Sequence, residues 1–440
     1  MKIKHQLFLT FCLLFALFSN KAKAQFNVGG QLIQRAEYRH GYGKLINEGV
    51  DPAAFVSQRF RLETKYQGKN YQIFGSVQDI RTWGSTSQTN ISDGFLSLHE
   101  GWAEIKIDTN WQIKVGRQEL NYDNARFLGN LDWALQARSH DFALIKFGHN
   151  KHKLHFGGGF NQDNEKLSGN EYKTANQYKT AQMLWYNYLN PKFELSFLFW
   201  NNGKQYLKYD SLGILKEQSV RMSQTIGLPR VKYKFENDFS ISAFAYYQMG
   251  NDIANKKYNA YDVSLLCTKV FFLDAEKKAS FKSTIGVEML SGTNSNNKEE
   301  INNSFTPMYG TNHLHNGYMD FFFVGGRFEN SVGLNDIYLQ LRYDKNKKWF
   351  LGLDIHNFSS NASVYKGSEL LSGKFGNEID LTYGVVFNED ISLQVGYSQM
   401  FSSATFKYLQ ATNAANSQNW MYVMLVIRPK NDKKFIGLLN

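Results

Sequence analysis

Long stretches of this chain alternate between apolar and polar residues with a period of two, which restricts them to two-faced strands. Between Val56 and Tyr66 one face is apolar except at Gln58, and the other carries arginine, glutamate and lysine. The same alternation appears at residues 337–343, 375–387 and 391–397. Such strands suit a wall with one apolar face and one polar face.

Short and long connections alternate between these strands. The short ones lie at residues 67–70, 108–110, 148–151, 190–191, 236–238, 274–278, 345–348 and 388–390. The long ones centre on residues 40–54, 84–96, 120–138, 161–177, 202–218, 250–258, 292–333, 359–374 and 402–417. This rhythm predicts an all-β fold, a closed antiparallel transmembrane β-barrel of about 18 strands, with short periplasmic turns and long extracellular loops. A large soluble β-protein is the alternative, but nothing requires such alternation there.

Composition favours the same architecture. The chain has 15% aromatic residues, 35 glycines and 5 prolines, which suits many paired strands. No apolar run after the N-terminus is long enough for a membrane helix, so a membrane protein of this sequence must be a closed barrel. Pro229 falls inside an expected strand, where we expect a bulge or a late strand start. The last expected strand, Trp420 to Arg428, is apolar on both faces.

The N-terminus reads as a signal peptide. A basic start precedes an apolar run from Leu7 to Phe18, and Ala22 and Ala24 provide the small residues that a signal peptidase recognises. We expect cleavage near Ala24, leaving residues 25–440 as a single barrel domain in the outer membrane. Cys267 is then the one remaining cysteine, so disulfides and thiolate metal clusters are excluded. The formal charge falls from +11 to +7, spread along the chain, and predicts no nucleic-acid binding.

Two groups of residues have types that occur in active sites, but a structural role explains each of them better. Ser139, His140 and Asp141 have the residue types of a hydrolase triad, but neighbours on a strand point to opposite faces. Glu100 and Glu104 share one strand face and could act on glycosides, although pairing with wall cations is the simpler use. We therefore expect no enzymatic activity and no cofactor.

Two groups of histidines have residue types that could ligate a metal ion. His149, His152 and His155 lie around a short turn, and His313 and His315 could share a strand face in the longest loop. Neither group has a nearby cysteine pattern or second carboxylate, so we expect solvated histidines and no metal site.

Two motifs carry a resemblance to a known family. The first runs from Gly116 to Asp141 and includes Gly116-Arg117-Gln118-Glu119-Leu120, Arg126-Phe127-Leu128-Gly129-Asn130 and Leu131-Asp132-Trp133. The second is Gly376-Asn377-Glu378-Ile379-Asp380-Leu381. Together they resemble the alginate-export family of outer-membrane barrels, over about residues 26–428. The resemblance implies an eighteen-stranded channel whose arginine-rich constriction conducts an anionic polysaccharide outward.

Charged residues on the polar faces define an expected solute path. It consists of Arg35, Arg39, Arg59, Arg61, Lys106, Lys114, Arg117, Arg126, Arg138, Glu100, Glu104, Glu119, Asp132, Asp141, Glu378 and Asp380. Arginine forks bind carboxylates in a bidentate manner, so this lining would favour anions. The alternative is that these charges brace one another and a folded-in loop.

The expected function is an outer-membrane channel, or porin, for anionic solutes, and by resemblance an export pore for an alginate-like polysaccharide. Its expected partners are outer-membrane lipid, an anionic saccharide or small organic anions, and a periplasmic export partner. The second hypothesis is a plugged barrel with a binding or structural role at the cell surface. Loop 292–333 could fold into the lumen as a plug or project outward as a binding surface.

Overall fold

The computed structural model describes residues 25–89, 92–297, 300–429 and 434–438. The predicted signal peptide, residues 1–24, lies outside the described residues. No helix in the described part of the chain is long and apolar enough to cross a membrane.

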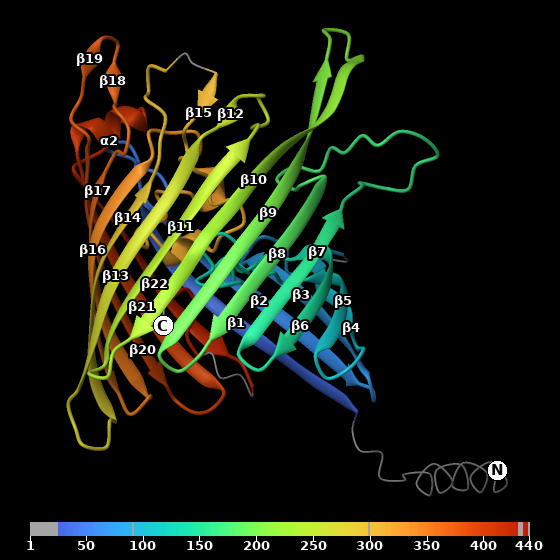
Figure 1. Cartoon of the computed structure of the whole chain (residues 1–440). Coiled ribbons are helices and arrows are strands. Elements are labelled where there is room, and N and C mark those ends of the chain that lie inside the picture. Colours follow the sequence, from blue (N-terminus) through green and yellow to red (C-terminus); the bar gives the residue numbers. More distant parts are fainter. Residues whose placement is uncertain (1–24, 90–91, 298–299, 430–433, 439–440) are drawn as a thin grey trace, which may run out of the picture.

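Eighteen antiparallel strands form one closed barrel (Figure 1). Each pairs with its neighbours in the chain, and β22 pairs with β1 to close the sheet. The strands are β1 (Phe26–His40), β2 (Ala53–Gln67), β3 (Tyr71–Thr82), β4 (Leu96–Lys106), β5 (Trp111–Gln118), β6 (His140–His149), β7 (His152–Phe160), β8 (Thr180–Leu189), β9 (Phe193–Tyr209), β10 (Leu215–Lys234), β11 (Phe239–Gly250), β13 (Ala260–Phe272), β14 (Ala279–Leu290), β16 (Leu334–Lys345), β17 (Trp349–Ser359), β20 (Lys374–Val386), β21 (Ile391–Ser402) and β22 (Ser417–Ile427). The predicted fold class and strand number are confirmed.

The predicted alternation of connections holds with one correction. Residues 202–218 were expected to form a loop, but most of them extend β9 and β10 into a long hairpin that turns at residues 210–214. The ladder continues here with Gln218 opposite Leu207, Ser219 opposite Tyr206 and Val220 opposite Gln205. Tyr206 and Val220 are residue types that suit strands. In Figure 1 this hairpin rises above the rest of the barrel.

The two faces of the wall separate as the alternation predicts. Phe60 and Leu62 on β2 are 51% and 41% exposed, whereas Arg59 and Arg61 between them are 0% and 4% exposed. The apolar residues therefore form the outer surface, and the charged residues point into the barrel. Outward apolar and inward polar faces are the arrangement of a transmembrane barrel.

Both sequence irregularities have a structural explanation. The register of β10 shifts against β9 and β11 around Pro229, which is the expected bulge. On β22, Met421 and Val423 face outward, while Trp420, Tyr422 and Met424 are buried inside the barrel. The strand is apolar on both faces because its inner face packs against segments that fill the lumen, rather than against water.

Short elements lie in the long loops. They are the strand pairs β12 (Lys257–Tyr258) with β15 (Ile301–Asn302) and β18 (Tyr365–Lys366) with β19 (Glu369–Leu370), the helix α2 (Ala404–Leu409), and the 3-10 turns η1 (Asn312–Leu314) and η2 (Val324–Gly326). Both strand pairs and α2 lie at the upper end of the barrel in Figure 1. The loop containing η1 turns into the barrel and helps to form the site described next.

Candidate functional site

One side of the lumen is a basic wall, which we define by the inward-facing cations near β1, β2 and β22. These are Arg35, Arg39, Arg59, Arg61 and Arg428. Glu37 accepts bonds of 2.8 Å from Arg35 and 2.8 Å from Arg39. Arg61 donates to the side-chain oxygen of Gln78 at 2.7 Å. Much of the charge on this wall is therefore already engaged by groups beside it.

The connection between β5 and β6, residues 119–139, folds inward and docks on the basic wall. We call it the first inner loop. The Asp132 carboxylate lies 2.7 Å from Arg59 and 2.8 Å from Arg428. Burial alone would raise the pKa of Asp132, but the two guanidinium groups hold it well below its usual value. Arg59 also donates to the carbonyl of Leu135 at 2.9 Å, so it braces this loop.

Another part of the lumen wall is acidic and is formed by inward carboxylates on β13, β14, β16, β17 and β20. They are Asp262, Glu288, Asp336, Asp354, Glu378 and Asp380. Arg126 of the first inner loop reaches this wall, with its Nε 2.8 Å from Glu288 and 3.2 Å from Asp262. Burial would lower the pKa of Arg126, but these carboxylates raise it. The first inner loop thus spans the lumen, anchored by opposite charges at its two docking points.

A second inner loop, residues 303–323, fills the space beside the first. Asn316 donates to Glu288 at 2.9 Å and to Asp336 at 3.2 Å, and the Met319 amide donates to Glu378 at 2.8 Å. Its Tyr309 hydroxyl donates to Asn202 of β9 at 2.7 Å. Of the two fates considered for loop 292–333, the inward one therefore applies to residues 303–323, while β15 stays at the loop end of the barrel (Figure 1).

The two inner loops touch each other near the centre of the lumen. The Trp133 indole stacks on the His313 ring with centroids 3.9 Å apart, and Arg35 lies 4.3 Å above the indole. Arg138 donates to the carbonyl of Gly310 at 2.9 Å, and burial lowers its pKa to about 10. These contacts make the loops one cross-piece that narrows the passage.

Residues 434–438, at the C-terminal end of the described chain, also lie inside the barrel. Gln394 donates to the Ile436 carbonyl at 3.0 Å, and the Ile436 amide donates back to Gln394 at 3.2 Å. The Phe435 ring packs edge-on against Phe350 at 4.8 Å. This tail occupies part of the lumen next to the wall formed by β17 and β21.

Cavities remain on both sides of the cross-piece. One of about 790 Å³ lies toward the long loops and is lined by residues that include Arg39, Arg81, Trp133 and Lys204. Two others, of about 760 Å³ and about 600 Å³, lie toward the short turns. The lumen therefore consists of vestibules at both ends with a narrow middle.

Two of the expected path residues do not face the lumen. Arg117 and Asp141 pair at 2.7 Å, but their strand neighbours Gln118 and His140 are the buried ones. Because successive side chains alternate between faces, the Arg117–Asp141 pair lies on the outer surface. Their place in the solute path is corrected, since the extended backbone turns them away from the lumen.

The remaining expected residues lie on the lumen face of β4 to β6 or beside it. Glu104 is ion-paired with Lys146, and the Lys114 ammonium lies 3.9 Å above the ring of Trp102. Lys106 is exposed at the short-turn end of β4. Lys114, Trp102 and Lys146 line the cavity of about 760 Å³, which lies away from the basic wall.

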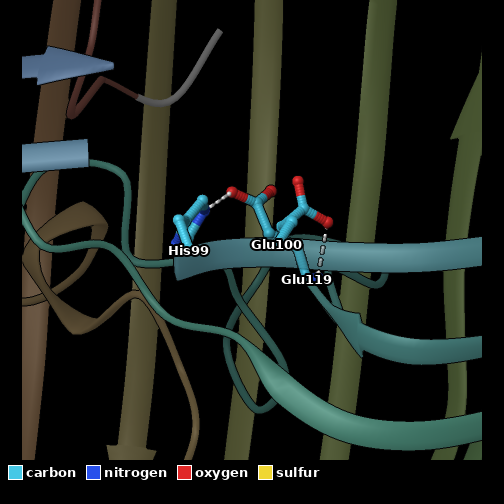
Figure 2. A group of neighbouring side chains, drawn as sticks. All are labelled: His99, Glu100 and Glu119. Atoms are coloured by element: carbon cyan, nitrogen blue, oxygen red, sulfur yellow. Dashed lines mark hydrogen bonds and ion pairs between the residues drawn. The ribbon is translucent and has the colours of Figure 1, made fainter. Parts of the chain in front are cut away.

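Glu100 and Glu119 meet His99 at the start of the first inner loop (Figure 2). His99 Nε2 lies 3.0 Å from the Glu119 carboxylate, and Glu100 accepts the Glu119 amide at 3.0 Å. Asn130 donates to the other Glu119 oxygen at 2.8 Å. Oxygen and nitrogen atoms of this kind could ligate a metal ion, yet their hydrogen bonds already explain the arrangement as a clamp on the loop.

The candidate triad and the loop histidines are separated by the fold. Asp141 faces outward while His140 is buried among aromatic rings, so the triad does not assemble. His313 bonds Asp320 at 2.7 Å, whereas His315 is buried elsewhere with its pKa lowered by burial and by Arg126. The idea that His313 and His315 share one face is wrong because they lie in an irregular loop rather than a strand.

Several important residues were not selected from the sequence. Glu37, Asp262, Glu288, His356 and Arg428 all face the lumen, and His356 lies 3.0 Å from Asp336. Strand alternation was the available signal for the four that lie in strands. Their pairing with distant loop residues could not be read from it.

Comparison with known families supports the resemblance found in the sequence. Residues 24–156 match the model of a family described as alginate export. The predicted resemblance to the alginate-export family is confirmed. The matching segment contains β1 to β6 and the first inner loop, and it ends before the second motif at residues 376–381. No curated protein matches the chain.

Solved structures share the barrel at low sequence identity. OpdL of Pseudomonas aeruginosa aligns with TM-score 0.58 and 11% identity, covering 92% of this chain and 99% of that one. OccAB4 of Acinetobacter baumannii gives 0.57 and 14%, covering 92% and 97%. OpdK of Pseudomonas aeruginosa with vanillate gives 0.56 and 11%, covering 91% and 98%. At these identities the likeness establishes the fold, that of an outer-membrane barrel.

Proposed function

We propose that this protein is an outer-membrane channel for anionic solutes. The observation that carries the proposal is the charge of the cavity toward the long loops. Its lining includes five cations, Arg35, Arg39, Arg81, Arg138 and Lys204, against the three carboxylates Glu37, Asp320 and Glu329. Fixed cations in a narrow passage raise the local concentration of anions.

The finer proposal is that the solute is an anionic polysaccharide and that it moves outward. The family match supports it, because the matched segment supplies the first inner loop and part of the basic wall. OpdK has been crystallised with vanillate, so a small organic anion is the alternative solute. We propose a transport role without catalysis, since the candidate triad does not assemble.

Ion selectivity in planar bilayers tests the proposal. The parent protein should show a reversal potential favouring anions in a salt gradient. The double variant Arg39→Gln/Arg81→Gln should reduce that preference, because both side chains are about 30% exposed, at 30% and 28%, and line the vestibule. Lys277→Gln/Lys347→Gln, on exposed short turns, serves as a control of equal charge. Cation selectivity of the parent would overturn the proposal.

A plugged barrel with a surface role is the second candidate, and the contacts between the inner loops favour it. Trp133, His313 and Arg35 stack in the middle of the lumen, and the C-terminal tail adds to the packing. Stable conductance steps from folded protein support the channel. Absence of conductance from protein that migrates as a folded barrel on unheated gels supports the plugged barrel.

A further inference from the structure

The periplasmic end of the lumen contains a second set of cations on the wall opposite β1 to β4. The cavity of about 600 Å³ is lined by Arg230, Lys232 and Lys234 of β10, Lys282 of β14, and Lys192 of the turn before β9. The carboxylates in its lining are Asp238 and Glu288, and Glu288 is already paired with Arg126. Lys192 is paired with Glu236 and Arg230 with Glu194, so the excess positive charge of this vestibule comes from Lys232, Lys234 and Lys282.

Three of these lysines differ from the arginines of the basic wall. Within the described residues, no side-chain hydrogen bond or ion pair within ordinary distances involves Lys232, Lys234 or Lys282. Glu194, the strand partner of Lys232, is held by Arg230 at 2.8 Å. Asp344, near Lys282, is bonded by Arg342 at 2.8 Å. The three ammonium groups are thus free to meet a ligand, whereas Arg59 and Arg126 are used to hold a loop.

Strand register arranges these cations around a hydroxyl-lined floor. Lys234 lies opposite Ser240, Ser240 opposite Thr268, and Thr268 opposite Thr284, so one inward row crosses four strands. Neighbouring strands lie about 4.8 Å apart, which separates β10 from β14 by about 14 Å. A ligand lying across this floor would meet lysines at both ends and hydroxyl groups between them.

Spacing along β10 adds a second direction to the site. Arg230, Lys232 and Lys234 occupy alternate positions on one face, which places them about 7 Å apart in succession. Arg230 is paired with Glu194, but Lys232 and Lys234 on β10 and Lys282 on β14 are separate cations, which match a ligand with repeated negative charges better than a single small anion. The hydroxyl floor complements the hydroxyl groups of a sugar chain.

We propose that this periplasmic vestibule, formed by Arg230, Lys232, Lys234 and Lys282 around Ser240 and Thr268, is a binding site for a linear carboxylated oligosaccharide. It is separate from the basic wall and lies on the other side of the inner loops. The proposal deepens the proposed function and rests on it for its biological role. It places recognition of the solute at the periplasmic end, before the narrow middle.

Direct binding tests the site without requiring an open channel. A hexamer of galacturonic acid is titrated into the folded barrel in detergent by calorimetry, with maltohexaose as the neutral comparison. We expect the acidic hexamer to bind and maltohexaose not to bind. Lys232→Gln/Lys282→Gln should weaken binding of the acidic hexamer at least tenfold. The variant should still migrate faster on unheated gels than after boiling, which shows that its barrel is folded.

Lys269→Gln is the matched control, since Lys269 lies on the outer face of β13, beside Phe271 and close to the same turns. It should bind like the parent. Equal binding by the double variant, equal binding of maltohexaose, or no binding of the acidic hexamer by the parent would overturn the site. If bilayers show no anion preference while the hexamer still binds through these lysines, the channel fails and the site stands. Anion preference without hexamer binding refutes the site alone.

Discussion

Trp133 and His313 stack almost parallel, with 3° between their ring planes and 3.9 Å between centroids. They come from loops 180 positions apart in the sequence, and their contact joins the two loops inside the barrel. The Arg35 guanidinium also lies over the Trp133 ring, so this one indole contacts the basic wall and joins it to both loops. The middle of the lumen is therefore occupied by packed loop residues rather than being an open pore.

Removing that indole should loosen the cross-piece. Trp133→Ala should increase single-channel conductance or the frequency of opening, because a buried Trp→Ala change removes about 3–5 kcal/mol of packing. Heat-modifiable gel mobility should stay as in the parent, since the wall ladder is untouched. Trp83→Ala, an exposed tryptophan outside the lumen packing, is the control. Unchanged conductance and gating in Trp133→Ala would mean that the stack does not limit the passage.

Asp132 is the sole loop carboxylate shared by Arg59 and Arg428 in the described contacts. Asp132→Asn should release the first inner loop, because it leaves two buried guanidinium groups without their counter-charge, a loss of about 3–5 kcal/mol. Limited proteolysis should then cut within residues 119–139. Asp108→Asn, in an exposed turn, should leave the cleavage pattern unchanged. A protected loop in Asp132→Asn would show that other contacts suffice.

The same carboxylate predicts how the loop responds to acid. The pKa of Asp132 is lower in the folded protein than in the unfolded chain, so its stabilisation is complete above the unfolded value of about 4. It is lost as the pH falls below that value toward the lower folded pKa. Loop cleavage by pepsin should therefore rise only at pH below about 4, and Asp132→Asn should abolish this step. A transition at pH 6 would contradict the assignment.

Membrane orientation can be checked by cysteine labelling. In a Cys267→Ser background, single cysteines at Ser87, Ser168 and Ser295 should react with an impermeant reagent on intact cells, because these residues lie in long loops. Cysteines at Asn110 and Asn388 lie in short turns and should react only after the outer membrane is opened. Labelling of both sets on intact cells, or the reverse order, would overturn the orientation.

Closure of the sheet predicts resistance to detergent. Since β22 pairs with β1, every strand has two neighbours and the barrel has no unpaired edge. Unheated protein should therefore migrate faster on gels than boiled protein. A deletion of β22 should remove the difference in mobility, whereas deletion of residues 363–371, which form the outer β18–β19 hairpin, should not. Equal mobility of the unheated and boiled parent would contradict a closed barrel.

The sequence by itself determined the wall of this protein. A strand has only two faces, so the alternation from Val56 to Tyr66 decides which side chains point inward wherever the strand pairs. The number of connections then gives the number of strands, and the alternation of short turns with long loops gives the orientation of the barrel in the membrane. The hairpin at residues 202–218 was the exception, because a ladder between polar strands leaves little periodic signal.

Only the tertiary structure decided what fills the lumen. Arg126 forms ion pairs with Asp262 and Glu288, and Asp132 forms one with Arg428. These partners are 136 to 296 residues apart in the sequence, so no local pattern encodes the pairing. Loop residues have no period, so their direction is set by the charges they meet on the wall. At the periplasmic end, Asn124 and His315 of the inner loops line the same cavity as Lys232 and Lys282, but neither residue supplies a carboxylate. Charge type could be read from the sequence, but the choice of partner is a property of the closed barrel.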